Sequence, residues 1–380
     1  MIKAMRIGVP KEIKNHEHRV ALTPAGAVLL ISAGHQVVVQ SKAGADSGFS
    51  DAAYEQAGAL VVPDAHQAWS QDLVVKVKEP QLSEYIFLRP ELTLFTYLHL
   101  AAFPELAGEL LVKKVCAIGY ETVQTDAGVL PLLKPMSEVA GRVAVQMGVY
   151  FLQKENGSAF PGKGCLPAGI GGAPPMHAVI VGAGNVGMNA ADAAAGLGAR
   201  VTLLETNESR IRQLQRETHE NITVVHFSHD GFYALLPTCD LLVGATLIPG
   251  KHAAQLLNRS DLRLMQPGSV FVDVSIDQGG ISETSRATSY DDPVYVEEGV
   301  IHCCLPNLPA AVPQTSTSAL TEATLPYIQT VAAHGVAGVL RDFPALARGI
   351  NTLAGEIINP AVASTLAGKI QGTAEKTTSL

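Results

Sequence analysis

The chain has 380 residues, of which 47% are hydrophobic and 16% charged, and its formal net charge is −8. This is the balance of a globular protein with material for two or three domains. The acidic balance, with no run of five like charges, argues against a nucleic-acid partner, and no stretch approaches about 18 uninterrupted apolar residues, so we expect no membrane span.

The first part of the chain alternates short β-rich segments with helical ones. Strands are predicted at residues 5–10, 35–40, 59–62, 72–80, 92–99 and 115–121, and helices at 24–34 and 50–58. The first helix carries its own signals, with Thr23 as the cap, Pro24 in the first position and Gly34 at the stop. This alternation predicts a mostly parallel sheet with helices on both faces, which is an α/β fold.

A second folding unit follows a long helix. Apolar and small residues recur at helical spacing over residues 136–155, and a loop rich in glycine and proline follows at 156–175. Further strands are predicted at 177–182, 200–205, 222–227, 240–246, 269–275 and 300–307. Beyond residue 310 the pattern is mainly helical, up to a polar tail at 372–380. The sequence therefore predicts two successive α/β units.

The five cysteines are scattered, apart from one adjacent pair. They fit neither a disulfide framework nor the CxxC spacing of zinc sites, and we expect Cys303 and Cys304 to lie in a buried strand. The N-terminal segment has no long apolar core before a cleavage site, so no signal peptide is expected. A reducing cytoplasm is the simplest location for such a chain.

A glycine-rich loop occupies residues 182–187, with the sequence Gly-Ala-Gly-Asn-Val-Gly. It follows a predicted strand, opens a helix of small residues, and leads to a second strand that ends at Glu205, 23 positions after Gly182. The three glycines permit a tight turn, a close approach to a pyrophosphate, and close packing of helix on strand. A carboxylate at Glu205 can bind ribose hydroxyls and repel a 2′-phosphate, which favours NAD over NADP. The alternative is a packing turn that binds no ligand.

Several polar residues lie at or near the ends of predicted strands, where open α/β sheets bind ligands. The candidates are Lys76, Lys78, His99 and Asp277. With Arg19 as a two-pronged clamp for a carboxylate, this set suits an amino or oxo acid. Lys78 would polarise a carbonyl, and His99 would move protons at the reacting centre. The alternatives are a core histidine at His99, a solvated Lys78 and a turn cap at Asp277.

Two histidines flank a glutamate at His16, Glu17 and His18, directly before Arg19. Imidazole and carboxylate groups are common metal ligands, so the triplet raises a metal-site hypothesis. A structural metal site needs three or four converging ligands, and the sequence offers no further set. We therefore predict no metal, and Arg19 stays a candidate clamp for a carboxylate.

Seven blocks of the sequence together resemble one family. They are MRIGVPKEIKNHEHRVALTPAG (5–26), KVKEP (76–80), LHLAA (98–102), YETVQ (120–124), PMSEVAGR (135–142), VDVSIDQGG (272–280) and TSTSALTEATLPY (315–327). In this order they are similar to alanine dehydrogenases, and the resemblance covers nearly the whole chain. The soluble subunit of NAD(P) transhydrogenase shares the opening block but usually lacks the second, third and fourth.

The resemblance implies an α/β protein of two Rossmann-like, doubly wound domains. Residues 1–133 and 311–380 would form the substrate domain, and residues 134–310 the NAD-binding domain. It also implies a cytoplasmic homo-oligomer, usually a hexamer, with a true start at Met5. The implied activity is the reversible, NAD-dependent oxidative deamination of L-alanine to pyruvate and ammonia.

The resemblance also implies roles for single residues. Arg19 and Lys78 match substrate-binding positions, and His99 and Asp277 match positions of catalytic proton transfer. The positions that match NAD contacts are Ser137, Gly182, Gly184, Asn185, Val186, Gly187, Glu205, Arg210, Ser228, Thr246, Leu247, Val274, Ser275, Ile276, Arg286, Leu305, Asn307 and Leu308.

Two positions depart from the family pattern. Glu205 stands where aspartate is usual, and Leu308 stands where methionine is common. The sequence also leaves two other functions open. One is a transhydrogenase-like subunit that holds NAD(H) and works through a membrane partner. The other is a dehydrogenase of another small amino acid, because a methyl-sized difference in substrate changes binding by only about 1–3 kcal/mol.

Overall fold

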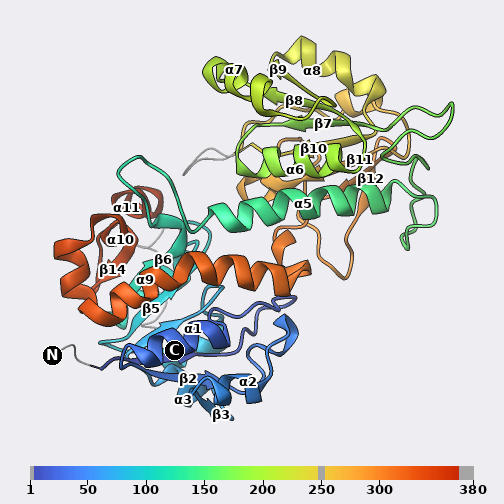
Figure 1. The fold of residues 1–380 in the computed structure, drawn as a ribbon. Helices are drawn as coiled ribbons and strands as arrows, with labels where there is room; N and C mark the ends of the chain where they lie inside the picture. The colour runs from blue at the N-terminus through green and yellow to red at the C-terminus, as the bar shows by residue number, and fades with distance from the viewer. Residues whose placement is uncertain (1–3, 247–252, 368–380) are drawn as a thin grey trace, which may run out of the picture. The chain divides into compact units, whose positions relative to one another are not determined.

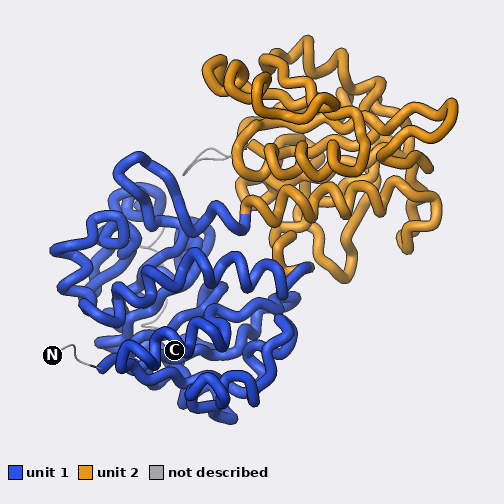
Figure 2. The backbone as a smooth tube through the Cα atoms, in the orientation of Figure 1, with its two compact units in different colours: residues 1–136, 312–380 blue, residues 137–311 orange. Residues whose placement is uncertain are grey.

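The computed structural model describes residues 4–246 and 253–367. The chain divides into two compact units, which Figure 2 shows in blue and orange. Unit 1 comprises Met1–Met136 and Val312–Leu380, and unit 2 comprises Ser137–Ala311. The long helix α5 (Lys134–Phe151) carries the chain from the first unit into the second. Each unit is built on a sheet of its own.

Unit 1 contains an eight-stranded sheet with the order β15-β14-β6-β5-β4-β1-β2-β3. Its strands are β1 (Arg6–Val9), β2 (Gln36–Gln40), β3 (Leu60–Val62), β4 (Leu73–Val75), β5 (Thr93–Thr96), β6 (Cys116–Gly119), β14 (Ile350–Leu353) and β15 (Glu356–Ile357). Strands β1 to β6 are parallel, whereas β14 pairs antiparallel with both β6 and β15. The central strands are fully buried, as expected for a sheet covered on both faces.

The α-helices of unit 1 each begin at a side-chain cap, at a proline, or at both. They are α1 (Pro24–Ser32), α2 (Asp51–Gln56), α3 (Ala65–Trp69), α4 (Pro104–Val112), α9 (Pro313–Asp342), α10 (Pro344–Ala347) and α11 (Pro360–Leu366), with 3-10 helices η1 (Ala45–Ser47), η2 (Leu82–Phe87) and η3 (Tyr120–Thr122). Thr23 caps α1 by accepting a hydrogen bond from the N–H of Gly26 (3.1 Å), and Pro24 takes the first position. The predicted start of this helix is confirmed.

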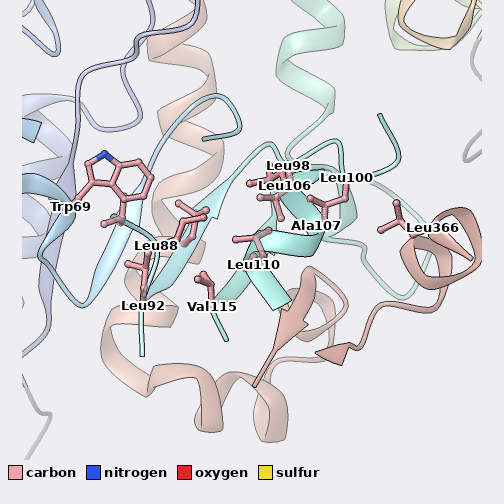
Figure 3. Packing of buried hydrophobic residues seen from close by; sticks show 13 residues of the cluster. Trp69, Leu88, Leu92, Leu98, Leu100, Leu106, Ala107, Leu110, Val115 and Leu366 are labelled. Atoms are coloured by element: carbon pink, nitrogen blue, oxygen red, sulfur yellow. The ribbon is translucent and has the colours of Figure 1, made fainter. Parts of the chain in front are cut away.

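A core cluster of unit 1 fixes the loop that follows β5 (Figure 3). Leu98 and Leu100 both belong to it and are 0% and 2% exposed. They share the cluster with Leu106 and Leu110 of α4. Each fully buried leucine contributes about 1.5–3 kcal/mol. The loop is therefore anchored on both sides of His99.

Unit 2 contains a seven-stranded sheet with the order β12-β13-β11-β10-β7-β8-β9, with helices on both of its sides (Figure 1). Its strands are β7 (His177–Val181), β8 (Arg200–Glu205), β9 (Ile222–His226), β10 (Leu241–Gly244), β11 (Val270–Asp273), β12 (Tyr295–Glu297) and β13 (Val300–Cys303). All pairs are parallel except β12 with β13. The helices that follow α5 are α6 (Asn185–Gly196), α7 (Glu208–Glu217) and α8 (His229–Leu235), with 3-10 helices η4 (Leu236–Thr238), η5 (Asp261–Leu264), η6 (Val274–Gln278) and η7 (Leu308–Ala311).

The two sheets have the same order of parallel strands. Numbered within each unit, the parallel strands run 3-2-1-4-5-6, which is the doubly wound Rossmann order. The predicted class, α/β with two Rossmann-like units, is confirmed. Each sheet has a switch point between its first and fourth strands, namely β1 and β4 in unit 1 and β7 and β10 in unit 2. Ligands of such sheets bind outside the carboxyl ends of the strands at this point.

The region beyond residue 310 is mainly helical, as predicted, but it also contains a hairpin that was not predicted, and one strand of the sheet is shorter than predicted. Residues 350–357 form the hairpin β14–β15 instead of continuing a helical region, because the edge of β6 offers a pairing partner more than 200 residues away in sequence. Strand β4 stops at Val75 although the apolar pattern continues, because the N–H of Val77 donates to the Glu12 carboxylate (2.6 Å) instead of to a strand. The predicted tail at 372–380 lies outside the described residues.

Two further features concern the described residues. None of their helices combines the length and the apolar character needed to cross a membrane. Cys303 ends β13 and Cys304 follows it, and both thiols are buried and reduced. We expected both residues to lie within one buried strand. Cys303 does, whereas Cys304 directly follows the strand.

Candidate active site

The carboxyl ends of the unit 1 strands carry the predicted substrate residues. Arg19 lies in the segment that follows β1, Lys78 follows β4 and His99 follows β5. Because β1 and β4 flank the switch point and β5 is the next strand, parallel pairing brings these three segments to one edge of the sheet. Unit 1 therefore brings two basic residues and a histidine together where its fold favours a ligand.

Arg19 is buried and held by Glu17. Its Nε and Nη2 atoms donate to the two Glu17 carboxylate oxygens, each at 2.6 Å, and its backbone N–H donates to the same carboxylate (3.1 Å). Nη1 lies 3.0 Å from the Met136 sulfur. Burial lowers the pKa of Arg19, but the Glu17 charge, the hydrogen bonds to Glu17 and the nearby Tyr97 and Glu12 together outweigh burial and raise it. Glu17 thus occupies the Nε–Nη2 edge of the guanidinium by a two-pronged contact.

Lys76 and Lys78 have different environments although they are two residues apart. Lys76 is fully buried, and its Nζ donates to Glu12 and to Glu84, each at 3.0 Å. Glu12 also accepts from the backbone N–H groups of Val77 (2.6 Å) and Lys78 (3.4 Å). Lys76 is therefore a structural cation, and its ion pairs fix the backbone that carries Lys78.

Lys78 is half-buried and lies among other cations. Burial lowers its pKa, and the positive charges of Arg19 and Lys14 lower it further. A lysine with a lowered pKa can exchange a proton more readily near neutral pH than a solvated one. This environment does not match the solvated surface lysine that the sequence left open.

His99 has a strained backbone that Glu121 holds in place. Its φ angle is 47°, in the left-handed region that non-glycine residues seldom adopt. The Glu121 carboxylate accepts hydrogen bonds from the N–H groups of His99 (2.7 Å) and Leu98 (3.1 Å). Burial, and then the charges of Lys78 and other cations, lower the pKa of His99 to about 4. The imidazole is therefore neutral near pH 7, as a proton acceptor must be.

The triplet His16, Glu17 and His18 does not converge on one point. Glu17 pairs with Arg19, and His18 contacts Asp46 (3.2 Å). Across residues 4–246 and 253–367, no group of three or more His, Cys, Asp or Glu side chains is arranged to hold a metal.

The loop of unit 2 has the geometry of a phosphate cradle. Gly182 has a φ of 102°, and a Cβ atom at Gly187 would lie 1.7 Å from the carbonyl oxygen of Gly182. Neither position accepts a side chain without moving the backbone. A Cβ at Gly184 would meet nothing within 4 Å, so open space lies before the first turn of α6. N–H groups at a helix start together with open space suit a dinucleotide pyrophosphate, so these residues fit NAD.

Glu205 ends β8 and connects to this loop. Its Oε2 accepts from the N–H of Ala183 (3.2 Å), and its Oε1 accepts from the N–H groups of Thr206 (2.7 Å) and Asn207 (2.9 Å). Burial would raise the pKa of Glu205, but these three N–H groups outweigh it and lower the pKa. The carboxylate thus stays ionised, and Oε2, which accepts from one N–H group, has a further lone pair with which to accept from a ribose hydroxyl.

The remaining predicted NAD residues lie mainly where strands of unit 2 end. Ser228 caps α8 after β9, Thr246 follows β10, and the Arg286 guanidinium lies 3.7 Å from the centre of the Tyr295 ring. Ser137 and Asn185 lie in α5 and α6, and Arg210 lies in α7. Val186 lies in α6, Val274, Ser275 and Ile276 lie in η6, Leu305 and Asn307 follow β13, and Leu308 begins η7. Leu247 lies outside the described residues.

Asp277 is exposed in the short helix η6, after β11. A second aspartate, Asp273, organises this segment from the buried end of β11. Its carboxylate accepts from the N–H groups of Ser275 (3.1 Å) and Ile281 (2.8 Å) and from the Ser285 hydroxyl (2.6 Å). Asp273 therefore fixes the backbone on both sides of Asp277.

Sequence reasoning missed the acids that hold the site. Glu12, Glu121 and Asp273 each accept backbone N–H groups next to a predicted functional residue, and Glu17 was considered only as a metal ligand. Their one signal in the sequence is the position of an acid at or just after a predicted strand, which many surface acids share. Their partners lie up to 66 residues away along the chain, so the contacts themselves leave no local pattern.

Comparison with known proteins identifies the family of the chain. Two family models match the chain: "Alanine dehydrogenase/PNT, N-terminal domain" over residues 8–140 and "Alanine dehydrogenase/PNT, C-terminal domain" over residues 144–360. The alanine dehydrogenase of Geobacillus stearothermophilus is 49% identical over 362 residues, which is 95% of this chain and 96% of the relative. A solved L-alanine dehydrogenase superposes with a TM-score of 0.92 at 44% identity, over 96% of this chain and 99% of that one.

A transhydrogenase from Sinorhizobium meliloti is also similar, with a TM-score of 0.79 over 94% of this chain and 99% of that one. Its identity is 23%, so this likeness shows a shared fold alone. The resemblance of the sequence blocks to alanine dehydrogenases is confirmed.

Proposed function

The chain belongs to the alanine dehydrogenase/PNT family, and from this we infer that it is an NAD-dependent oxidoreductase. It converts L-alanine, NAD and water reversibly to pyruvate, ammonia and NADH. The observation that carries this conclusion is the 49% identity with an alanine dehydrogenase over 95% of the chain. The two basic side chains at the strand ends of unit 1, Arg19 and Lys78, support it, because alanine and pyruvate both carry a carboxylate.

We propose that unit 1 binds the substrate. The Arg19 guanidinium would bind the substrate carboxylate, and Lys78 would contribute positive charge beside the group that becomes the carbonyl. The charge of Lys78 and its lowered pKa suit contact with an oxygen that gains electron density. Glu17 would set the orientation of the guanidinium, since it is bonded through two parallel N–H groups.

We propose that His99 and Asp277 transfer protons. Oxidation at the α-carbon gives an imine, to which water adds before ammonia leaves, so protons must be taken from water and given to nitrogen. His99 is neutral near pH 7 and suits the first task. His99 can then give this proton to nitrogen, and Asp277, exposed in η6 on a backbone that Asp273 fixes, would assist that transfer as a second proton carrier.

We propose that unit 2 binds NAD through the loop 182–187 and Glu205. NAD, when bound, supplies the acceptor for the hydride that leaves the α-carbon. Glu205 would accept hydrogen bonds from the adenosine ribose and disfavour the 2′-phosphate of NADP. The remaining NAD contacts predicted from the resemblance, together with a hexameric assembly and a cytoplasmic location, are part of this proposal.

The test is an assay of NADH formation from NAD with alanine and other small L-amino acids, together with the reverse reaction from pyruvate and ammonia. We expect alanine to be preferred, and His99→Gln and Asp277→Asn to lower kcat by about 10²–10⁴-fold. NADH affinity should stay unchanged in both variants. His18→Gln is the matched control, because its ring is exposed and pairs only with an exposed aspartate among the described contacts.

Binding of NADH without turnover of any amino acid would contradict the dehydrogenase function. It would favour a subunit that only holds NAD(H). Equal turnover of several small amino acids would instead keep the enzyme class and remove the preference for alanine.

A further inference from the structure

Glu79 directly follows Lys78 and has a carboxylate that is only partly paired. Its side chain is 3% exposed. Oε1 accepts hydrogen bonds from Lys14 Nζ and from Gln81 Nε2 (3.3 Å). Oε2 is buried and has no hydrogen-bond partner in the part of the chain that the structure describes. An unpaired buried carboxylate oxygen is costly, so its presence points to a partner gained in the working state.

The imidazole of His99 is the group placed to become that partner. Its Nδ1 atom lies 3.9 Å from Oε2 of Glu79. This is too long for a direct hydrogen bond, but a small rotation of the ring or one bridging water closes the gap. The backbone of His99 is already fixed by Glu121 and by the burial of Leu98 and Leu100. Only the side-chain torsions of His99 are left to adjust.

We propose that Glu79 is the positioning residue for His99, accepting the Nδ1–H hydrogen bond so that Nε2 is left unprotonated toward the substrate. The inference rests on the proposed function, in which His99 transfers protons. Histidines that work as bases or ligands often have one ring nitrogen fixed by a carboxylate in this way, which settles the tautomer.

The charges around the ring explain why such a carboxylate is needed. The titratable groups that face His99 in unit 1 are Lys14, Arg19, Lys78, Glu79, Tyr97 and Glu121. Burial and the three cations keep the ring neutral at rest, but they also oppose the imidazolium that forms when Nε2 takes a proton. The Glu121 carboxylate is committed to two backbone N–H groups. Glu79 Oε2 remains as the acid that can stabilise the imidazolium.

The proton transfer balances within this arrangement. When water adds to the imine carbon, its oxygen forms the new C–O bond and the π pair of the C=N bond moves to nitrogen. The Nε2 lone pair takes the proton as the O–H bond of the water breaks. The imidazolium keeps its Nδ1–H bonded to Glu79, and Nε2 later returns the proton to the departing nitrogen. Glu79 itself neither gains nor loses a proton, so it acts through His99 and not on the substrate.

The test compares Glu79→Gln with Lys14→Gln, since both remove the Lys14–Glu79 ion pair and change the charge near His99 in opposite directions. For Glu79→Gln we expect kcat to fall by about 10–100-fold with little change in alanine KM, and the acidic limb of the pH profile of kcat/KM to move to lower pH. For Lys14→Gln the same limb should move to higher pH, because a cation that opposes protonation of His99 is gone. Glu79→Asp keeps the charge and should restore part of kcat.

Several results would overturn the proposal while leaving the proposed function intact. One is a wild-type kcat with an unmoved pH limb in Glu79→Gln. Another is a shift in the same direction for Glu79→Gln and Lys14→Gln, which would mean that the ion pair matters only for structure. If Glu79→Gln does not fold, Glu79→Asp tests the proposal instead. A kcat below the wild-type value with little change in alanine KM would support it, and a wild-type kcat would overturn it. Absence of alanine turnover in the wild-type protein would instead contradict the proposed function.

Discussion

The two units of this protein share a strand order and yet form their switch points from different materials. In unit 1 the switch point is surrounded by buried charged side chains, which are Glu12, Glu17, Arg19, Lys76, Glu79 and Glu84. In unit 2 the corresponding turn after β7 is made of glycines and backbone N–H groups. The same topology therefore offers a charged site in one unit and a backbone cradle in the other.

The use of charged side chains in unit 1 and of backbone groups in unit 2 matches the ligand that each site is proposed to bind. A small amino acid has few atoms, so its recognition depends on charged groups that contact its carboxylate at fixed angles. A dinucleotide is long, and backbone N–H groups at a helix start can hold its pyrophosphate without a buried charge. Substitutions in the two units are therefore expected to have different consequences. Unit 1 depends on pairing its buried charges, and unit 2 depends on close backbone packing.

The largest effect is expected from Lys76→Met, which tests the charged side of the comparison. The substitution leaves Glu12 and Glu84 buried without their cation, so the free energy of unfolding should fall by about 3–5 kcal/mol. Trp69 is the one tryptophan of the chain, and its ring centre lies 5.6 Å from Lys76 Nζ. Its fluorescence in urea therefore reports the unfolding of unit 1.

The matched control for Lys76→Met is Arg212→Met, in which an exposed ion pair with Glu208 is lost. We expect a change below about 0.5 kcal/mol there. Equal effects of the two substitutions would show that burial of the charge does not decide its importance.

A smaller effect, on binding, is expected from Gly187→Ala, which tests the backbone side. The new Cβ would lie 1.7 Å from the Gly182 carbonyl oxygen, so the loop must move. Overpacking of this kind costs about 2–3 kcal/mol, which corresponds to a rise of about 100-fold in the Kd of NADH. Titration of NADH fluorescence measures it.

Gly196→Ala is the control for Gly187→Ala, because it adds the same methyl group to the same helix where nothing lies within 4 Å. NADH affinity should be unchanged, and the helix should gain slightly in stability. If both variants bind NADH as the wild type does, the loop is not the site of the pyrophosphate.

The smallest effect is expected from Arg19→Lys, which keeps the charge but removes the planar fork. A lysine can meet Glu17 or the substrate carboxylate, but it cannot hold both along two edges. We expect the KM for alanine to rise by about 10–100-fold, while the Kd of NADH stays within about twofold of wild type. An unchanged KM would remove Arg19 from substrate binding, and a large change in NADH affinity would contradict the assignment of separate sites to the two units.

Local patterns were sufficient to predict most of the fold. The alternation of apolar strands and capped helices predicted every parallel strand from β1 to β11, together with β13. The glycine spacing at 182–187 and the acid at Glu205 are short-range signals with a direct physical meaning. The hairpin β14–β15 and the edge strand β12 were not predicted, because such short segments become strands only when a distant edge accepts their hydrogen bonds.

The candidate site, too, was predictable only in part from local patterns. The sequence by itself determined which residue types stand after which strands, because strand order and spacing are encoded in local apolar periodicity. It could not determine that Glu17 occupies one edge of Arg19, that Lys76 is locked between Glu12 and Glu84, or that Glu79 lies beside His99. Most of these pairings join segments from different strand ends, and the choice among nearby acids and cations depends on desolvation and on distances of a few ångströms. Only the tertiary structure fixes these, and they distinguish the lysine proposed to act on the substrate from the lysine that holds the fold.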